Sequence, residues 1–139
     1  MTTGLDTTLG LVVTEVSPDL VVLRCELGPQ HLEPFGIVHG GLYATLVESA
    51  ASIAANNWLG PPRTAAGISN QTDLYRSISA GTVTAVATPV HRGRQQQVWQ
   101  VNISSADGKL LARGQLRLLN DSDPHLTEPG QQATTERQR

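Results

Sequence analysis

The chain has 139 residues, with 10 Lys and Arg against 12 Asp and Glu, and its formal charge is -2. This length suits one domain with room for a hydrophobic core, and the charge excludes a global positive field that would attract nucleic acid or an anionic membrane. The single cysteine, Cys25, excludes an intramolecular disulfide, and no Cys/His spacing predicts a metal site.

The chain has no apolar stretch of about 18 residues that predicts a membrane span. Its N-terminal segment lacks the basic start and apolar run of a signal peptide, so we expect a cytoplasmic protein. We interpret residues 1–9 as a flexible N-terminus, residues 10–119 as one domain and residues 120–139 as a disordered polar tail.

The first predicted elements lie between residues 9 and 27, where the runs LGLVVTEVS and LVVLRCEL alternate apolar and polar residues. Pro18-Asp19 separates the runs, so the pattern predicts two strands joined by a turn. We interpret Cys25, in the second run, as a small buried hydrophobe. Residues 28–39 contain two prolines and two glycines, which predict a loop.

Residues 40–59, GGLYATLVESAASIAANNWL, predict the clearest helix. The segment is rich in Ala and Leu, has no internal proline and ends before Gly60-Pro61-Pro62. It is apolar on nearly every side, so we expect other structure to enclose it.

Four more segments have strand character, at about residues 65–78, 82–91, 95–105 and 109–119. Ser79-Ala80-Gly81 and Ala106-Asp107-Gly108 predict tight hairpin turns, and Arg92-Gly93-Arg94 interrupts the run between them, so we expect an antiparallel meander. The whole pattern predicts an α+β fold in which about six antiparallel strands wrap one long central helix. The exposed back of the helix and the edge strands favour pairing of copies.

Glu48 is a carboxylate in the middle of this apolar helix, and none of the residues one turn away can neutralise it. Burying an ionised carboxylate is costly unless it is hydrogen-bonded, so Glu48 either lines a polar cavity, as a candidate site, or points to solvent. Ser52 lies four residues on, on the same face, where its hydroxyl could hold water against the carboxylate or be an ordinary small helix residue.

His39, Gly40 and Gly41 stand at the entrance of the helix. Glycines allow close approach of a ligand, and free amides at a helix N-terminus attract developing negative charge, so this turn is a candidate oxyanion hole for an ester or thioester. The alternative is that the glycines ease a tight turn. His39 either polarises the carbonyl and orients a substrate or satisfies backbone groups in the loop.

Positive charge is concentrated in His91-Arg92-Gly93-Arg94, at a strand junction. Two arginines beside a glycine suit phosphate groups, although such a run is also typical of a solvated turn.

The order of elements and the string EPFGIVHGGLYATLVESAAS together resemble the hotdog-fold thioesterases, in the branch related to phenylacetate-pathway (PaaI-like) and 4-hydroxybenzoyl-CoA thioesterases. HRGRQQQVWQVNISSADGKLLARGQLRLL is similar to the closing strands of that family, so the resemblance covers about residues 10–119. It implies a hotdog fold and a homodimer or homotetramer. The activity that it implies requires no metal or cofactor.

The resemblance also implies residue roles. Glu48 falls at the catalytic carboxylate, Gly40 at the amide that binds the thioester oxygen, and Ser52 at a hydroxyl that helps to position water or the acyl group. His39 and Gly41 belong to the same turn. The segment containing Arg92, Gly93 and Arg94 lies where family members contact coenzyme A.

Glu33 departs from the family pattern, because an Asn or Gln usually stands six residues before the histidine. An amide can donate to a carbonyl oxygen, whereas an ionised carboxylate cannot. Asp73, in a strand expected to line the acyl pocket, is either a second acid near the site or a surface residue, and we favour the surface.

The function that follows is hydrolysis of an acyl-CoA or aryl-CoA thioester, with Glu48 as general base or as nucleophile. Two alternatives remain open: a hotdog hydratase or dehydratase acting on an acyl thioester, and a non-catalytic module that binds acyl-CoA.

Overall fold

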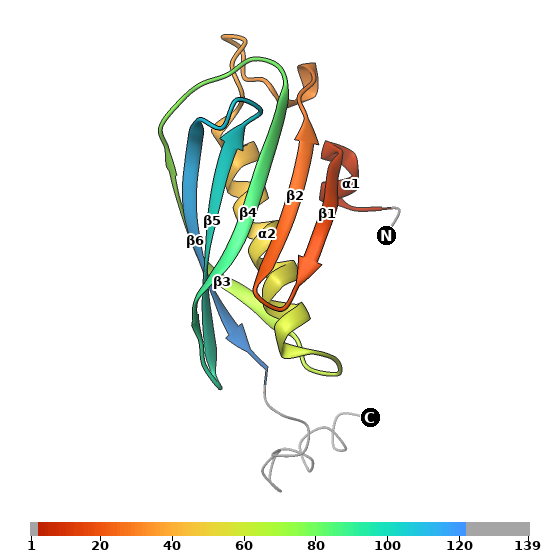
Figure 1. The fold of residues 1–139 in the computed structure, drawn as a ribbon. Coiled ribbons are helices and arrows are strands. Elements are labelled where there is room, and N and C mark those ends of the chain that lie inside the picture. Colours follow the sequence, from red (N-terminus) through yellow and green to blue (C-terminus); the bar gives the residue numbers. More distant parts are fainter. Residues whose placement is uncertain (1–2, 122–139) are drawn as a thin grey trace, which may run out of the picture.

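The computed structural model describes residues 3–121, which form one sheet and one long helix (Figure 1). The elements in chain order are α1 (Leu5–Leu9), β1 (Leu11–Ser17), β2 (Leu20–Glu26), the short 3-10 helix η1 (Pro29–His31), α2 (Gly40–Leu59), β3 (Ala65–Leu74), β4 (Thr82–Arg92), β5 (Gln96–Ser105) and β6 (Leu110–Asn120). The predicted helix and its stop at Gly60 are confirmed, as are the six strands. The polar tail expected from residue 120 lies, from residue 122 on, outside the described residues.

The six strands form one antiparallel sheet in the order β1-β2-β4-β5-β6-β3. The hairpins at Pro18-Asp19, Arg92-Gly93-Arg94 and Ala106-Asp107-Gly108 are confirmed by this order. Strands β4, β5 and β6 form the expected meander.

The predicted hairpin at Ser79-Ala80-Gly81 is wrong, and so is the inclusion of the third strand in the meander. β3 pairs with β6 at an edge of the sheet, whereas β4 pairs with β2. Residues 75–81 instead form a loop tied to its surroundings, with the Val38 amide donating to the Ile78 carbonyl and the Leu27 amide to that of Gly81. Pairing with β6 places β3 along α2, and this extends the cover of the helix.

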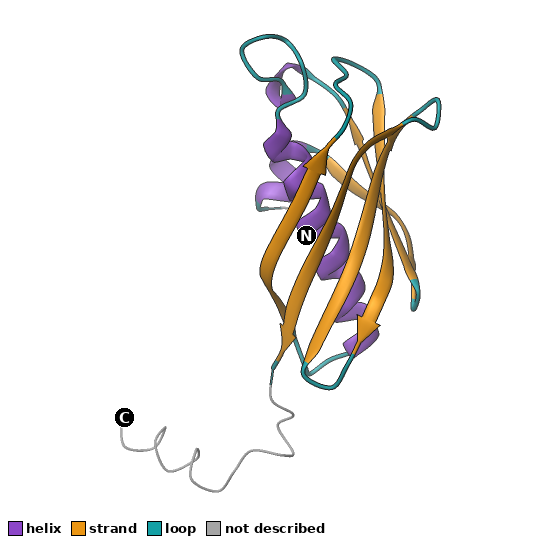
Figure 2. Cartoon of the chain, turned by 90° about the vertical axis from the view of Figure 1, so that its left-hand side faces the viewer, coloured by secondary structure: helices purple, strands orange, loops and turns teal. Residues whose placement is uncertain are grey.

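The core lies between α2 and the sheet, and Figure 2 shows the helix running along one face of the strands. Alternate residues of β4, β5 and β6 are buried against it, as expected for a sheet with one covered face. Small side chains at Ala50, Ala51, Ala54 and Ala55 let α2 approach the strands closely. The largest fully buried side chains include Trp99, Leu23, Leu46, Ile103, Leu111, Leu116 and Leu118.

The N-terminal segment contains a helix that the sequence analysis missed. α1 packs near α2, where the Ser49 hydroxyl donates a hydrogen bond of 2.6 Å to the Asp6 carboxylate. Behind it, the buried His31 ring bonds to the Leu9 carbonyl at 2.6 Å. A five-residue segment is too short for helix periodicity to be recognised in the sequence, and these tertiary bonds hold it.

Within residues 3–121, no helix has the length and apolar character needed to cross a bilayer.

Candidate functional site

His39 caps α2. Its backbone is extended, and its ring Nδ1 accepts a hydrogen bond of 2.8 Å from the Gly41 amide. Because Nδ1 is the acceptor, the proton of the neutral ring is on Nε2, and the exposed side chain keeps one N–H donor. The capping role expected as one alternative is therefore present, and it leaves the second ring nitrogen available.

The amides at the start of α2 are not equivalent. The Gly41 amide is used by His39, and the Leu42 amide donates to the His39 carbonyl at 3.0 Å. The Gly40 amide has no hydrogen-bond partner among residues 3–121. Leu74 Cδ1 lies 2.7 Å from the position that a Cβ on Gly40 would occupy, so a side chain there would displace Leu74. Gly40 thus offers a free N–H at the positive end of the helix.

Glu48 is half-buried and turned toward β3. Its Oε2 accepts a hydrogen bond of 3.1 Å from Asn70 Nδ2, and its Oε1 lies 2.5 Å from the position that a Cβ on Gly67 would take. No Lys, Arg or His of the described chain forms an ion pair with it. The carboxylate therefore has a polar partner on β3, in keeping with the first of the two alternatives that the sequence left open, a polar environment.

Asn70 and Gly67 were missed by the sequence analysis. Asn70 occupies a position of β3 that faces the helix, together with Thr72 and Leu74. An asparagine at a helix-facing strand position indicates that a polar group lies opposite it on the helix. A register shift between Gly67 and Ser69 interrupts the alternation of faces, and this irregularity concealed the signal.

Ser52 lies in the helical row that runs from Glu48 to Asn56. Both neighbours in that row contact β3, since Glu48 accepts a hydrogen bond from Asn70 and the Asn56 side-chain amide bonds to the Ala65 peptide. The Ser52 side chain is half-buried, and its hydroxyl has no partner within the described chain. The predicted shared face of Glu48 and Ser52 is consistent with this row, and the free hydroxyl can hold a water molecule.

Glu33 stabilises the loop before the helix. Its Oε1 accepts hydrogen bonds from the amides of Phe35 at 2.9 Å and Ile37 at 3.2 Å. The carboxylate thus serves as an acceptor for the backbone, a role that the carbonyl oxygen of an amide side chain could also fill. Compared with the Asn or Gln of the family pattern, Glu33 lacks an N–H donor but still makes the hydrogen bonds that hold the loop.

Asp73 is exposed on the face of the sheet opposite Glu48. It shares that face with Gln71 and its register partner Arg113, and with Gln100 and Gln115 these residues line a shallow hollow of about 160 Å³. The structure therefore does not bring Asp73 to the helix face of β3. This placement agrees with the surface interpretation that we favoured.

Arg92 lies at the other end of α2 from His39. Its guanidinium bonds to the Asp19 carboxylate at 2.8 Å and to the Pro18 carbonyl at 3.0 Å. The guanidinium carbon also lies 5.5 Å from the ring centroid of Trp58 and 5.7 Å from that of Trp99. Arg92 is thus engaged by its own protomer.

Gly93 and Arg94 form the exposed part of this turn. With His91, Gln95 and Gln96 they line an open hollow of about 480 Å³. The Arg94 side chain has no hydrogen-bond or ion-pair partner among residues 3–121, while its carbonyl accepts from Asn120 Nδ2 at 3.2 Å. The 20 residues of α2 span about 30 Å of rise between His39 and this end of the helix, so one protomer does not unite the two clusters.

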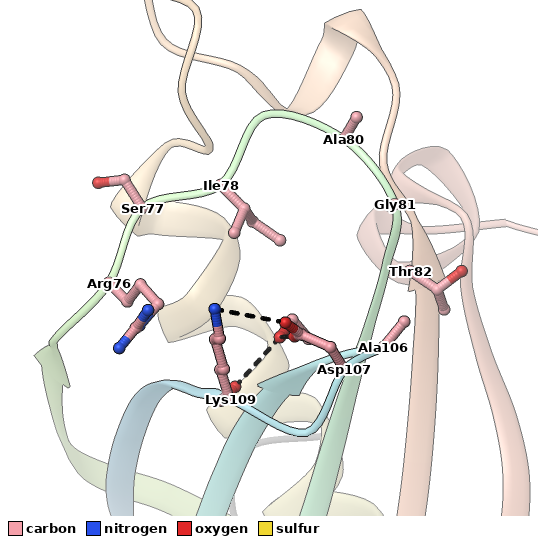
Figure 3. Close-up of a pocket in the computed structure, with 10 residues that line it drawn as sticks. Arg76, Ser77, Ile78, Ala80, Gly81, Thr82, Ala106, Asp107 and Lys109 are labelled. Atoms are coloured by element: carbon pink, nitrogen blue, oxygen red, sulfur yellow. Dashed lines mark hydrogen bonds and ion pairs between the residues drawn. The ribbon is translucent and has the colours of Figure 1, made fainter.

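A hollow of about 430 Å³ lies at the His39 end of the molecule (Figure 3). Residues 76–78, residues 80–82 and the β5–β6 turn line it, and Figure 3 shows Arg76 and Lys109 on one side. Lys109 forms an ion pair with Asp107 at 3.5 Å. The hydrogen bond from the Ser105 hydroxyl, and after it the charge of Lys109, holds the pKa of the Asp107 carboxyl below its usual range. The Arg76 guanidinium has no partner in the described part of the chain, so it can bind an anion.

Two buried groups lie outside these clusters. Burial raises the pKa of the Cys25 thiol, with the Glu26 charge adding to the effect, so the thiol stays protonated. Burial likewise raises the pKa of Tyr43, whose hydroxyl lacks a hydrogen-bond partner among residues 3–121. Nothing in this part of the chain gathers three or more His, Cys, Asp or Glu side chains in the manner of a metal site.

Sequence comparison relates the chain to known enzymes. The sequence model of the thioesterase superfamily matches residues 35–112. Rv1847 of Mycobacterium tuberculosis, which bears a provisional esterase name, is 44% identical over 123 residues, covering 86% of this chain and 88% of that one. The 1,4-dihydroxy-2-naphthoyl-CoA hydrolase of Listeria monocytogenes is 35% identical over 108 residues, covering 78% and 88%.

Solved structures agree with the sequence comparison. The structure of the Mycobacterium tuberculosis protein superposes with a TM-score of 0.81, covering 86% of this chain and 98% of that one at 44% identity. A thioesterase from Haemophilus influenzae gives a TM-score of 0.82 at 30% identity, covering 86% and 85%. The chain therefore belongs to the thioesterase superfamily, with its hotdog fold, and is a thioester hydrolase.

Proposed function

We propose that the protein hydrolyses an acyl-CoA or aryl-CoA thioester to the free acid and coenzyme A. The observation that carries this proposal is the presence, on one helix, of an unbonded amide at Gly40 and of a carboxylate at Glu48 that has no ion-pair partner among the described residues. The amide polarises the thioester carbonyl, and the carboxylate acts on the carbonyl carbon. Family membership weighs against the hydratase and the non-catalytic alternatives.

The spacing of the two groups supports this division of roles. Glu48 lies eight residues after Gly40, about 12 Å along the helix axis, which leaves room for the thioester group between the amide and the carboxylate. The Nε2–H of His39 offers a second donor beside Gly40. The Ser52 hydroxyl, one turn beyond Glu48, helps to hold the attacking water.

Two routes agree with this arrangement. In the first, Glu48 takes a proton from water, hydroxide adds to the carbonyl, and the thiolate of coenzyme A leaves and is protonated. In the second, Glu48 attacks the carbonyl and expels the thiolate, and water then hydrolyses the acyl-glutamyl anhydride. A single turnover in ¹⁸O-water separates them, because only the second route can place the label in the Glu48 carboxylate.

Coenzyme A as the leaving group is supported by the named CoA-ester hydrolase among the relatives and by the unpaired Arg76 and Arg94. Guanidinium groups bind phosphates in bidentate fashion, and coenzyme A carries three phosphates. Such substrates occur inside cells, so we place the enzyme in the cytoplasm. The acyl group stays open between aliphatic and aromatic.

An oligomer completes this site in our proposal. β3 is an edge strand whose residues are exposed on both faces, and Ile68 is 54% exposed. Antiparallel pairing of two β3 edges would reverse one copy relative to the other, so that the Arg94 turn of a second copy approaches the His39 end of the first. We therefore propose a homodimer, itself able to pair into a homotetramer.

The test is release of free coenzyme A thiol from benzoyl, phenylacetyl, short-chain and long-chain CoA esters. Glu48→Gln and Glu48→Ala are expected to lose at least about 100-fold in kcat while keeping their circular dichroism spectrum. Glu15→Gln removes an exposed carboxylate of β1 and is the matched control. Hydrolysis by Glu48→Ala at the wild-type rate would refute the proposed role, and an enoyl absorbance change without thiol release would favour the hydratase.

A further inference from the structure

The contact between β3 and the middle of α2 carries an inference beyond the proposed function. We propose that Asn70, oriented by Thr72, is a positioning residue that presents one chosen oxygen of Glu48 to the reaction. The inference rests on Glu48 being the reactive carboxylate.

The Asn70 carboxamide is bonded on both sides. Its Nδ2 donates to the Ala44 carbonyl at 3.0 Å and to Glu48 Oε2 at 3.1 Å, and its Oδ1 accepts from the Thr72 hydroxyl at 2.7 Å. Turning the amide over would bring an oxygen against two acceptor oxygens. The bonds therefore define the orientation of the amide.

Packing beside Gly114 of β6 also holds the Thr72 side chain in place. Its hydroxyl oxygen lies 2.9 Å from the position that a Cβ on Gly114 would occupy, beside Val47. The absence of a side chain at Gly114 gives Thr72 room on the helix face of β3, from which its hydroxyl reaches Asn70. The orientation of Asn70 thus depends on packing between three elements, α2, β3 and β6.

The consequence for Glu48 is that its two oxygens differ. Oε2 is engaged by Asn70, whereas Oε1 lies over Gly67, where any side chain would meet it at 2.5 Å. Among the described residues Oε1 has no hydrogen-bond partner, so it is the oxygen able to take a proton from water or to attack a carbonyl. Asn70 and Gly67 hold the carboxylate from two sides.

No charged side chain of residues 3–121 forms an ion pair with Glu48. The sheet-side contacts of Glu48 are Asn70 and Gly67, and Asp73 points to the opposite face of β3. On α1, Asp6 is bonded to Ser49, the next residue of the helix. A single neutral amide therefore sets the carboxylate geometry.

The test compares kcat, KM and pH–rate profiles of variants on one strand. Asn70→Ala is expected to lower kcat by about 10- to 100-fold with KM within about twofold, because a reacting group released from its position loses productive geometry. Gln71→Ala, which removes an amide one residue away on the other face, is the control and should keep the wild-type rate.

Asn70→Asp keeps the shape but places a second carboxylate beside Glu48. Because two adjacent carboxylates resist ionising together, the acid limb of the pH–rate profile is expected to move up by about one pH unit or more. Thr72→Val should lower kcat in the same direction by a smaller factor, and Thr72→Ser should restore it. A merely structural role for Asn70 would lower the melting temperature of Asn70→Ala without lowering kcat of the folded enzyme.

The outcomes separate the two proposals. If Glu48→Ala is inactive while Asn70→Ala and Asn70→Asp keep the wild-type kcat and pH profile, the positioning role is wrong and the proposed function stands. If Glu48→Ala is fully active, the proposed function itself fails. If Asn70→Ala does not fold, the Thr72→Val and Thr72→Ser variants test the proposal instead, since an unchanged kcat in Thr72→Val would show that Thr72 does not orient Asn70 for the reaction.

Discussion

The side chain of Asn56 pairs reciprocally with the peptide of Ala65. The Ala65 amide donates to Asn56 Oδ1 at 2.8 Å, and Asn56 Nδ2 donates to the Ala65 carbonyl at 3.0 Å. The pair fastens the beginning of β3 to the last turns of α2, while Asn70 fastens its middle. Two asparagine amides therefore align an edge strand with the helix that carries Glu48.

Replacement of Asn56 by alanine is expected to lower the free energy of unfolding by about 2 kcal/mol, because two half-buried peptide groups lose their partner. Asn56→Asp keeps the acceptor for the Ala65 amide but turns a carboxylate oxygen toward the Ser52 and Ala65 carbonyls, so it should also be destabilised at neutral pH. Urea unfolding measures both. Equal stability of Asn56→Ala and wild type would show that water replaces the pair without cost.

His39 combines a cap with a free donor, and the two roles can be separated. His39→Asn retains a side-chain acceptor for the helix N-terminus, whereas His39→Ala should cost about 1 kcal/mol of stability. We expect His39→Asn to keep the wild-type melting temperature and to lose about tenfold or more in kcat/KM, because the imidazole Nε2–H is gone. Full activity of His39→Asn would limit the histidine to capping.

Glu33 is expected to act through the loop it holds. Glu33→Ala removes the acceptor of the Phe35 and Ile37 amides, and Phe35, 92% exposed at the loop tip, should then be cleaved faster by chymotrypsin. Glu33→Gln retains an acceptor oxygen and should resist cleavage like the wild type. Equal cleavage rates for all three proteins would contradict the proposed stabilisation of the loop.

The two arginines of the β4–β5 turn should behave differently. Arg92→Ala is expected to lower stability by about 1 to 2 kcal/mol, because it removes contacts with Trp58, Trp99 and Asp19. Arg94→Ala should keep the melting temperature and raise KM for CoA esters, with a weaker dependence of KM on salt. The reverse pattern would make Arg92 the phosphate ligand.

Cys25 gives stability a definite dependence on pH. Burial raises the thiol pKa above its unfolded value, so the folded state holds the proton more tightly. This contribution is complete below the unfolded pKa of about 8.5 and is lost as pH rises through the folded value.

The difference in unfolding free energy between wild type and Cys25→Ala isolates this contribution, because Tyr43 titrates in the same direction in both proteins. That difference should shrink as the pH rises above about 8.5. The native thiol should also react slowly with a disulfide reagent until guanidinium is added. Rapid reaction of the native protein at neutral pH would contradict the buried, protonated thiol.

The sequence by itself determined the local elements. Helix α2 was predicted to the residue, since composition, the missing proline and the glycine-proline stop all act within a few neighbours. Strand alternation identified six strands, and the fixed rise of a helix set the spacing of Gly40 from Glu48. The element order and the string around His39 also indicated the family.

The tertiary structure decided what lies between distant residues. β3 pairs with β6 across the sheet, although a turn-like Ser79-Ala80-Gly81 suggested pairing with β4. Asn70 meets Glu48 from 22 residues away, and a register shift at Gly67/Ser69 conceals which residues face the helix. The periodicity of apolar residues indicates local elements, because it depends on neighbours along the chain. Strand order depends on which pairing of strands covers the helix, and that is a property of the assembled core.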